Sequence, residues 1–223
     1  MKPSTKTFIF FFVIFYITWA VRATVFYNLV DLPIQDENVR LVFSNIVKLL
    51  LWVIPAVVYV VWLERADPLK ALKITTPINK HGLALGAVAS LLYFVVVVVS
   101  EKFNSGRTLA PLLQASASMW LVKLAQVFFS PIFEEIMFRG FVLPRLGEQM
   151  KFLEANLLQA VLFTAMHWPN WITVNGLQIG LVAMSVSILV IGLLLGWVAQ
   201  RANSIWPSVV VHTINNFLVA FLG

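Results

Sequence analysis

The stretch LVAMSVSILVIGLLLGWV, residues 181–198, contains no charged residue and no proline. A helix needs about 20 consecutive apolar residues to cross the hydrocarbon of a bilayer, so this run is close to the required length. Similar runs recur along the whole chain of 223 residues, of which 60% are hydrophobic, and the mean hydropathy is +0.88. Such a composition exceeds what a soluble domain needs to fill its core. The sequence therefore predicts an all-α protein built as a polytopic transmembrane helical bundle.

We predict about seven membrane spans, with eight as the alternative count. Pro131 and Pro144 lie in the long fourth segment, which we expect to be kinked or to end in a helix along the membrane interface. Lys2 and Lys6 ahead of the first apolar run also fit a cleaved signal peptide, but a retained first span is the preferred interpretation. The approximate limits of the seven segments are 7–27, 41–63, 82–100, 114–146, 155–171, 177–200 and 204–222.

The basic residues predict the orientation of the bundle, because Lys and Arg accumulate in cytoplasmic loops. A cytoplasmic N-terminus leaves Arg40, Lys102 and Arg107 outside, and Arg22, Lys48 and Lys123 within spans. It places the other basic residues on the cytoplasmic side, namely Lys2, Lys6, Arg65, Lys70, Lys73, Lys80, Arg139, Arg145, Lys151 and Arg201. This topology accounts for the net charge of +6, so a nucleic-acid partner is not expected. The expected partner is the lipid bilayer, and the expected location is the plasma membrane.

Cysteine is absent from the sequence. Disulfide bonds, a thiol nucleophile and a cysteine-based metal site are therefore excluded. Any catalysis must use carboxylate, imidazole or hydroxyl groups.

Two pairs of glycines occur at four-residue spacing, Gly82 with Gly86 and Gly192 with Gly196. Small residues at this spacing lie on one face of a helix and let two helix backbones approach closely. We interpret both pairs as packing sites within the bundle.

Two adjacent carboxylates, Glu134 and Glu135, lie inside an apolar segment. A charge near the middle of a bilayer costs about 2.5 to 3.5 kcal/mol on insertion scales, so it needs a partner or a function. Glu134 and Glu135 are therefore the first candidates for a functional site. The other acidic residues lie in or beside connections where we expect water to solvate them: Asp31, Asp36, Glu37, Glu64, Asp67, Glu101, Glu148 and Glu154.

Helical geometry predicts different roles for the two glutamates. Glu135 and Arg139 lie on one face with the acid N-terminal, which is the favourable order for an ion pair. Glu134 points about 100° away from Glu135, so we expect it to stay unpaired and to act as the base that takes a proton from water. Glu134 lies at the same depth in the membrane as His167 only if the fourth helix continues past Arg139 toward Leu146. We therefore predict that this helix continues. The alternative is that these charges mark a solvated helix end at the cytoplasmic surface.

Two of the three histidines lie within apolar spans. His167 follows Phe163 by four residues and Asn216 follows His212 by four, so each imidazole has a neighbour on the same helix face. An amide such as that of Asn216 can orient an imidazole, hold water or donate to an oxyanion. Each histidine alone also fits a hydrogen-bonded helix contact, and we expect His81 to be solvated at a loop end. Together with a carboxylate, the two intramembrane histidines predict a polar cavity suited to hydrolysis.

Three motifs occur in order along the chain: Glu-Glu-x-x-x-Arg at 134–139, Phe-x-x-x-His at 163–167 and His-x-x-x-Asn at 212–216. Their order and spacing resemble those of the CAAX protease and bacteriocin-processing family, the Abi group, which includes type II CAAX prenyl endopeptidases. The resemblance covers residues from about 114 to 222, which we interpret as the catalytic, motif-bearing core of a single integral membrane domain over 1–223.

The resemblance implies an intramembrane endopeptidase with a cavity open to the membrane and the cytoplasm. Its substrate would be a membrane-associated peptide or lipidated protein, cleaved in CAAX-type C-terminal processing or in bacteriocin processing. Glu134 resembles the base that activates water. The groups that hold water and stabilise the oxyanion correspond to His167, His212 and Asn216, and the supporting residues correspond to Glu135, Arg139 and Phe163.

A cofactor is not required in this interpretation. A zinc protease usually presents His-Glu-x-x-His on one helix, whereas the groups here come from three helices and asparagine is a poor zinc ligand. If a divalent metal such as zinc takes part, His167 and His212 are its expected ligands. Two other functions remain open. One is a non-catalytic bacteriocin-immunity or scaffold membrane protein, and the other is a proton-coupled transporter in which the buried acids and histidines form a relay.

Overall fold

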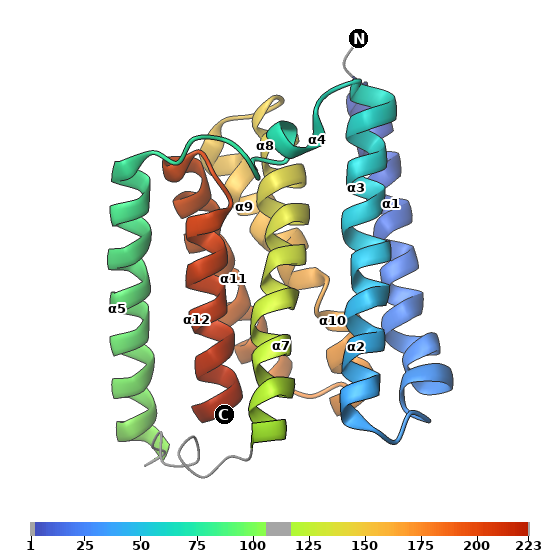
Figure 1. Ribbon diagram of the computed structural model, residues 1–223, viewed down its shortest axis with the longest axis vertical. Helices are drawn as coiled ribbons and strands as arrows, with labels where there is room; N and C mark the ends of the chain where they lie inside the picture. The colour runs from blue at the N-terminus through green and yellow to red at the C-terminus, as the bar shows by residue number, and fades with distance from the viewer. Residues whose placement is uncertain (1–2, 106–116, 223) are drawn as a thin grey trace.

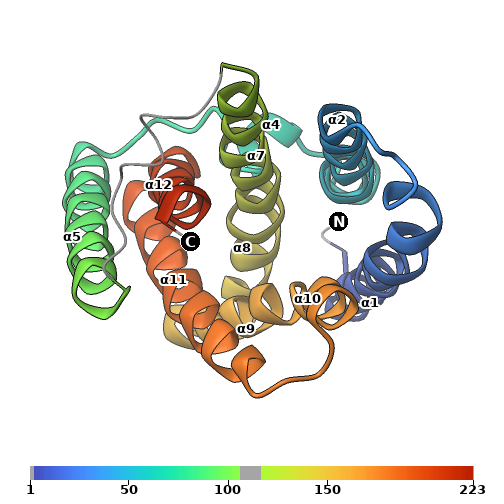
Figure 2. The same ribbon diagram turned by 90° about the horizontal axis from the view of Figure 1, so that it is seen from below.

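The computed structural model describes residues 3–105 and 117–222, and every regular element in these two segments is a helix. The long helices stand side by side along one axis (Figure 1). Viewed along that axis, α7 and α8 lie in the middle, with α5, α11 and α12 on one side and α1 and α2 on the other (Figure 2). The predicted all-α bundle is confirmed.

The N-terminal part of the chain forms two long helical runs, a short helix and a third long helix. Asp36 caps the second run by accepting from the backbone N–H groups of Asn38 and Val39. The elements are α1 Thr5–Val21, η1 Arg22–Asp31, α2 Glu37–Lys48, η2 Leu49–Val53, α3 Ile54–Val58, η3 Tyr59–Glu64, α4 Pro68–Ala71 and α5 Lys80–Ser105. The η segments are π-helical turns that continue the neighbouring α-helices without a break.

The C-terminal part begins with a helical run that continues through three elements. These are α7 Ala117–Glu135, η4 Ile136–Val142 and α8 Leu143–Gly147. They are followed by α9 Phe152–Ala165, α10 Trp168–Asn175, α11 Gly180–Ala202 and α12 Trp206–Leu222.

Three helical runs among the described residues are long and apolar enough to cross a membrane: Thr5–Asp31, Glu37–Glu64 and Gly180–Ala202. A shorter apolar helix covers Lys80–Val96. The chain is therefore an integral membrane protein, while the count of seven spans stays a prediction.

The segment 155–171, which we predicted as one span, is divided between two helices. Pro169 has no N–H to donate to the carbonyl of Ala165, and its ring would clash with that carbonyl, so α9 ends there. The carbonyl of Ala165 accepts instead from the Tyr16 hydroxyl at 3.2 Å, and that of Met166 accepts from the Trp19 indole at 2.9 Å. Both donors lie on α1, so the break between α9 and α10 is stabilised by the first helix.

The fourth helix continues past Arg139 through α8, as predicted, and the alternative of a separate interface helix is wrong. Pro144 cannot donate to the carbonyl of Gly140, which lies four residues earlier in the π-helical turn η4. The guanidinium of Arg145 donates to that carbonyl at 3.3 Å and to the carbonyl of Phe141 at 2.8 Å. The helix therefore continues through Pro144, because the carbonyls of Gly140 and Phe141 accept hydrogen bonds from Arg145 instead.

Both glycine pairs are packing sites, as predicted. A Cβ on Gly192 would lie 3.3 Å from the Cβ of Ala160, and one on Gly196 would lie 1.9 Å from the side-chain oxygen of Asn156, so α11 packs closely on α9. A Cβ on Gly82 would lie 2.1 Å from the Cα of Ala202, which joins the start of α5 to the end of α11. The close approach of these backbones depends on the missing side chains.

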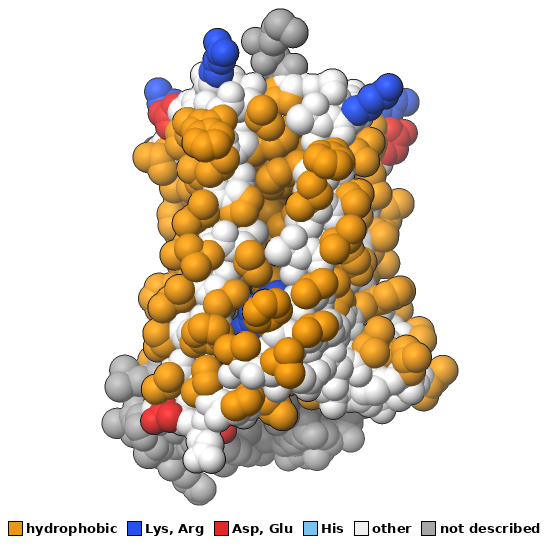
Figure 3. Space-filling view, turned by 90° about the vertical axis from the view of Figure 1, so that its right-hand side faces the viewer, with side chains coloured by type: hydrophobic (Ala, Val, Ile, Leu, Met, Phe, Trp, Pro, Cys, Tyr) orange, Lys and Arg blue, Asp and Glu red, His pale blue; other side chains and the backbone are white. Residues whose placement is uncertain are grey.

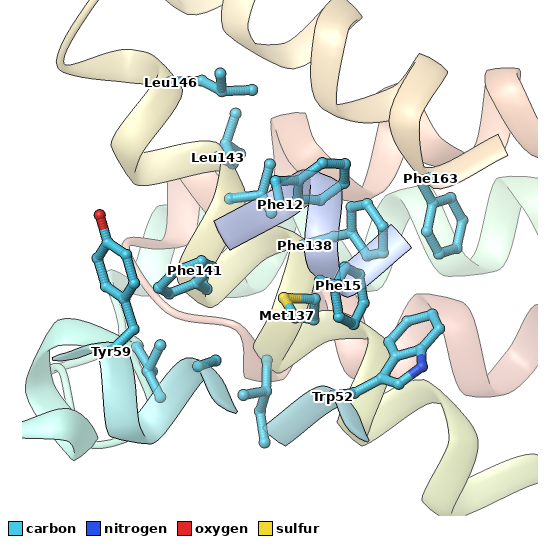
Figure 4. Packing of buried hydrophobic residues seen from close by; sticks show 14 of the residues in the cluster. Phe12, Phe15, Trp52, Tyr59, Met137, Phe138, Phe141, Leu143, Leu146 and Phe163 are labelled. Carbon is cyan, nitrogen blue, oxygen red and sulfur yellow. The ribbon is translucent and has the colours of Figure 1, made fainter. Parts of the chain in front are cut away.

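The largest buried cluster is aromatic and lies between α1, the α2–α3 run, η4 and α9 (Figure 4). Phe138 lies at its centre. Its ring centroid is 6.4 Å from that of Phe12, 5.8 Å from that of Trp52 and 5.1 Å from that of Phe163. The cluster thus connects the N-terminal helices to the two helices that carry the first two sequence motifs.

Candidate active site

Glu135 and Arg139 form the predicted ion pair. The Arg139 guanidinium donates to Oε1 of Glu135 at 2.9 Å, and neither side chain is exposed. A second guanidinium nitrogen donates to the carbonyl of Gly192 on α11 at 2.9 Å. The alternative of a solvated helix end is therefore wrong, and so is the cytoplasmic position predicted for Arg139, because both charges lie inside the bundle.

Glu134 is paired, contrary to the sequence prediction. Its Oε1 accepts hydrogen bonds from the ammonium group of Lys48 and, at 2.8 Å, from the hydroxyl of Ser130. Lys48 comes from α2, so it is far away in sequence and no motif connects it to Glu134. The other oxygen, Oε2, is buried without a hydrogen-bond partner among the described residues. The prediction that Glu134 stays unpaired is therefore wrong, and only Oε2 is left without a donor among the described residues.

Lys48 is a functional candidate that sequence reasoning missed. Its Nζ donates to Ser130 at 2.7 Å and lies 4.7 Å from the ring centroid of Trp52 and 5.8 Å from that of Trp19. A cation packed over indole rings is stabilised by their negative faces. The available signal was a lysine within an apolar span, since such a charge needs a partner or a purpose.

His212 lies between the two glutamates. Its Nδ1 is 2.8 Å from Oε1 of Glu135, and its Nε2 is 3.6 Å from Oε2 of Glu134. An ionised carboxylate only accepts, so Nδ1 carries a proton and donates it to Glu135. Nε2 is left facing the free oxygen of Glu134.

His167 lies in the turn between α9 and α10. Its Nδ1 is 2.8 Å from the carbonyl of Phe163, and a carbonyl only accepts, so Nδ1 is the donor. The ring centroids of His167 and Trp171 are 5.3 Å apart. The backbone bond fixes the tautomer, which leaves Nε2 of the neutral ring as an acceptor.

Phe163 is the packing centre shared by the motifs. Its ring lies edge-on to those of His167 and His212, with centroids 4.9 and 5.8 Å away, and the Arg139 guanidinium carbon lies 4.4 Å from its centroid. The ring is fully buried. It fixes both imidazoles by contact, which is consistent with the supporting role that the resemblance implies.

Asn216 presents its amide from α12. Its side-chain oxygen accepts from the amide of Asn215 at 3.0 Å, and Asn215 in turn accepts from the hydroxyl of Tyr93 on α5. This chain occupies the oxygen of Asn216 and leaves its NH₂ group as a donor. Asn215 and Tyr93 were not among the predicted site residues, and only the polar character of Asn215 within an apolar helix pointed to it.

A cavity of about 570 Å³ joins these groups. Glu134, His167 and Asn216 line it together with Lys48 and Ser130. His212 is not a lining residue, but its Nε2 lies 3.6 Å from Oε2 of Glu134. The predicted polar cavity within the bundle is thus present. The other lining residues are Trp19, Arg22, Ala23, Tyr27, Asp31, Leu41, Ser44, Asn45, Trp52, Val127, Met166, Asn170 and Val219.

A second charged pair lines the same cavity. Arg22 donates to Asp31 at 2.5 Å and to Ser44 at 3.3 Å. Asp31 is 1% exposed, so the prediction that water solvates this carboxylate is wrong. The π-helical turn η1 carries both members of the pair and continues α1 as far as Asp31, which keeps the aspartate within the bundle.

His81 is exposed at the start of α5, as expected for a solvated histidine. A group of three or more His, Asp and Glu side chains placed to hold a metal ion is not found within 3–105 and 117–222. His167 and His212 each have Nδ1 anchored and Nε2 available, which is the arrangement that a metal ligand also needs. Metal binding by these two residues stays a prediction.

The fold and the site together define an integral membrane protein with a carboxylate, two imidazoles and an amide gathered around a cavity. Residues 116–218 match the family model described as type II CAAX prenyl endopeptidase Rce1-like, and all three motifs fall inside the match. This region of the chain is therefore similar to the family, which confirms the resemblance. No curated protein and no solved structure matches the chain.

Proposed function

We propose that the protein is an intramembrane endopeptidase that hydrolyses a peptide bond of a membrane-associated substrate with a water molecule activated by Glu134. The family match supports an endopeptidase of the CAAX type. Processing of a bacteriocin-like peptide is the alternative substrate that the three motifs leave open. The main structural support is that Glu134 on α7, His167 in the α9–α10 turn and Asn216 on α12 line one cavity.

Glu134 is the general base. Its Oε1 is held by Lys48 and Ser130, so Oε2 is the oxygen that takes a proton from water. The water oxygen then forms a bond to the carbonyl carbon of the substrate. The proton on Glu134 passes to the departing amide nitrogen as the carbon–nitrogen bond breaks, so the carboxylate is regenerated.

The imidazoles and the amide act on the water and on the oxyanion. Nε2 of His167 accepts a hydrogen bond from the attacking water, and the NH₂ group of Asn216 donates to the oxyanion. The Nδ1 of His212 is bound to Glu135, and its Nε2 lies beside Glu134. When Nε2 is protonated, it donates to the oxyanion as well. If a divalent metal binds, Nε2 of His167 and of His212 would hold it together with Glu134, and the metal would polarise the carbonyl.

The test is cleavage of candidate peptides by purified protein in nanodiscs, followed by mass spectrometry. Prenylated C-terminal peptides and unprenylated leader peptides are compared, each with and without a chelator. We expect Glu134→Gln to lower kcat about 10²- to 10⁴-fold, because a general base contributes that much.

Glu37→Gln is the matched control, since it removes an exposed carboxylate in the first turn of α2, outside the cavity. Its rate should equal that of the wild type. Equal rates for Glu134→Gln and the wild type would contradict the proposal, as would a wild type that cleaves no peptide in either set.

A further inference from the structure

The cavity occupies only one half of the length of the bundle. Along the first run it extends from Trp19 to Asp31, and along the second it extends from Leu41 to Trp52. These stretches flank the connection between α1 and α2, at the end of the molecule opposite the N-terminus (Figure 1). The cavity therefore lies between the depth of Glu134 and this end, which we call the α1–α2 end.

Lining residues on α10 and α12 also place the cavity toward the α1–α2 end. Val219, which lines the cavity near the end of α12, is 63% exposed, and Asn170 on α10 is also exposed. Ser44 and Asn45 on α2 are partly exposed. A path of polar groups therefore leads from the surface near the α1–α2 end to Lys48 and Glu134.

The path in the opposite direction is filled by side chains. From Glu134 the helix continues toward the N-terminal end of the bundle, and Met137, Phe138 and Phe141 on it are fully buried (Figure 4). A second cavity of about 240 Å³ lies beyond them, lined by residues such as Tyr59. The aromatic cluster separates this second cavity from Glu134.

The basic side chains gather at the N-terminal end. On the face in Figure 3 the Lys and Arg side chains lie almost entirely at that end. At the α1–α2 end the described residues include Arg40 and Lys102. The basic residues of the N-terminal end are Lys6, Arg65, Lys70, Lys73, Lys80, Arg145, Lys151 and Arg201. Because Lys and Arg accumulate on the cytoplasmic side, the N-terminal end faces the cytoplasm.

We infer that the cavity opens to the non-cytoplasmic side of the membrane, and that Glu134 acts on a peptide segment of a membrane-associated chain on that side. The inference rests on the proposed function for its substrate, and it differs from the cytoplasmic opening that the family resemblance implies. It restricts the substrates to peptides that have been inserted or translocated, and it leaves out cytoplasmic tails.

The absence of cysteine makes the side of access directly measurable, because a single introduced cysteine is the only thiol in the chain. Asn45→Cys and Asn170→Cys report on the cavity. Gln35→Cys in the exposed α1–α2 connection and Thr75→Cys at the exposed N-terminal end report on the two surfaces. Ser187→Cys on the exposed face of α11 is the control for a thiol in lipid.

Intact cells are treated with a charged, membrane-impermeant maleimide, and a second sample is treated after permeabilisation. We expect Gln35→Cys, Asn45→Cys and Asn170→Cys to react in intact cells, Thr75→Cys to react only after permeabilisation, and Ser187→Cys to stay unreactive. The inference is overturned if both cavity cysteines react only after permeabilisation, if they react under neither condition, or if Thr75→Cys reacts in intact cells.

A second measurement connects access to cleavage. Labelling Asn45→Cys from outside should lower peptide cleavage at least tenfold relative to the same variant without label, whereas labelling Thr75→Cys should not change it. Full cleavage after labelling at Asn45 would contradict the proposed route. If the cysteines are labelled as expected but the protein cleaves no peptide, the proposed function is rejected and the open side of the cavity is still established. Failure of the proposed function is therefore distinguishable from failure of the inference about access.

Discussion

The two halves of the chain contribute to the candidate site in different ways. The C-terminal half carries the three motifs and the family match, and it supplies the proposed base, both imidazoles and the amide. The N-terminal half has no motif, yet it supplies Lys48 and the pair of Arg22 with Asp31. The family match therefore covers the proposed reacting groups, whereas Lys48, Arg22 and Asp31 come from helices that the match leaves out.

The charges of the two halves are also stabilised differently. In the C-terminal half, Arg139 and Glu135 lie four residues apart on one helix. Between the halves, Lys48 reaches Glu134 across a helix interface. The first contact follows from helical spacing alone, and the second requires the packing of the whole bundle. The predictions below test each kind of contact.

The largest effect on stability is expected for Arg139→Met. The change leaves Glu135 as a buried charge without its main partner, and breaking a buried pair in this way costs about 3 to 5 kcal/mol. Unfolding of the purified protein in detergent micelles measures the loss. Arg201→Met, an exposed arginine at the end of α11, should change stability little. A further Glu135→Gln change should recover part of the loss, and a stable Arg139→Met single variant would contradict the structural role of the pair.

Much of the fold and site could be predicted because the information is local. Apolar runs of about 20 residues predict spans directly. The pairing of Glu135 with Arg139 and the packing of Gly192 and Gly196 follow from helical periodicity. The depth of Glu134 was also predictable, because only a longer fourth helix brings it level with His167.

The wrong predictions for Asp31 and Glu134 have a common physical cause, which is that both side chains are enclosed by the packing of the bundle, and local hydropathy does not show this packing. Asp31 looked solvated because it follows an apolar run, but the π-helical turn η1 carries it into the bundle beside Arg22. Glu134 looked unpaired because no cation occurs at helical spacing from it on the side away from Glu135. The partner comes from Lys48, and helix periodicity gives no information about which helices are neighbours.

Lys48→Met tests whether the N-terminal half contributes to catalysis as well as to packing. A hydrogen bond to a charged group is worth about 1.5 to 3 kcal/mol, so we expect kcat to fall about 10- to 100-fold with KM nearly unchanged. Lys48→Arg should recover a large part of the rate because it keeps the cation. Lys70→Met, which removes an exposed lysine on α4, serves as the control. If Lys48→Met keeps the wild-type kcat per folded molecule, Lys48 is only a structural cation.

Gly82→Ala tests the contact between the two halves away from the cavity. The new Cβ would lie 2.1 Å from the Cα and 2.4 Å from the backbone nitrogen of Ala202, so α5 must move away from the end of α11. Overpacking of this kind costs about 1 to 3 kcal/mol, measured again as unfolding in micelles. Gly147→Ala has no atom within 4 Å of the new Cβ and should be neutral. Because Tyr93 on α5 holds Asn215, a displaced α5 should also lower the cleavage rate. Lost stability with an unchanged rate would show that the hydrogen-bond chain to Asn216 does not depend on the position of α5.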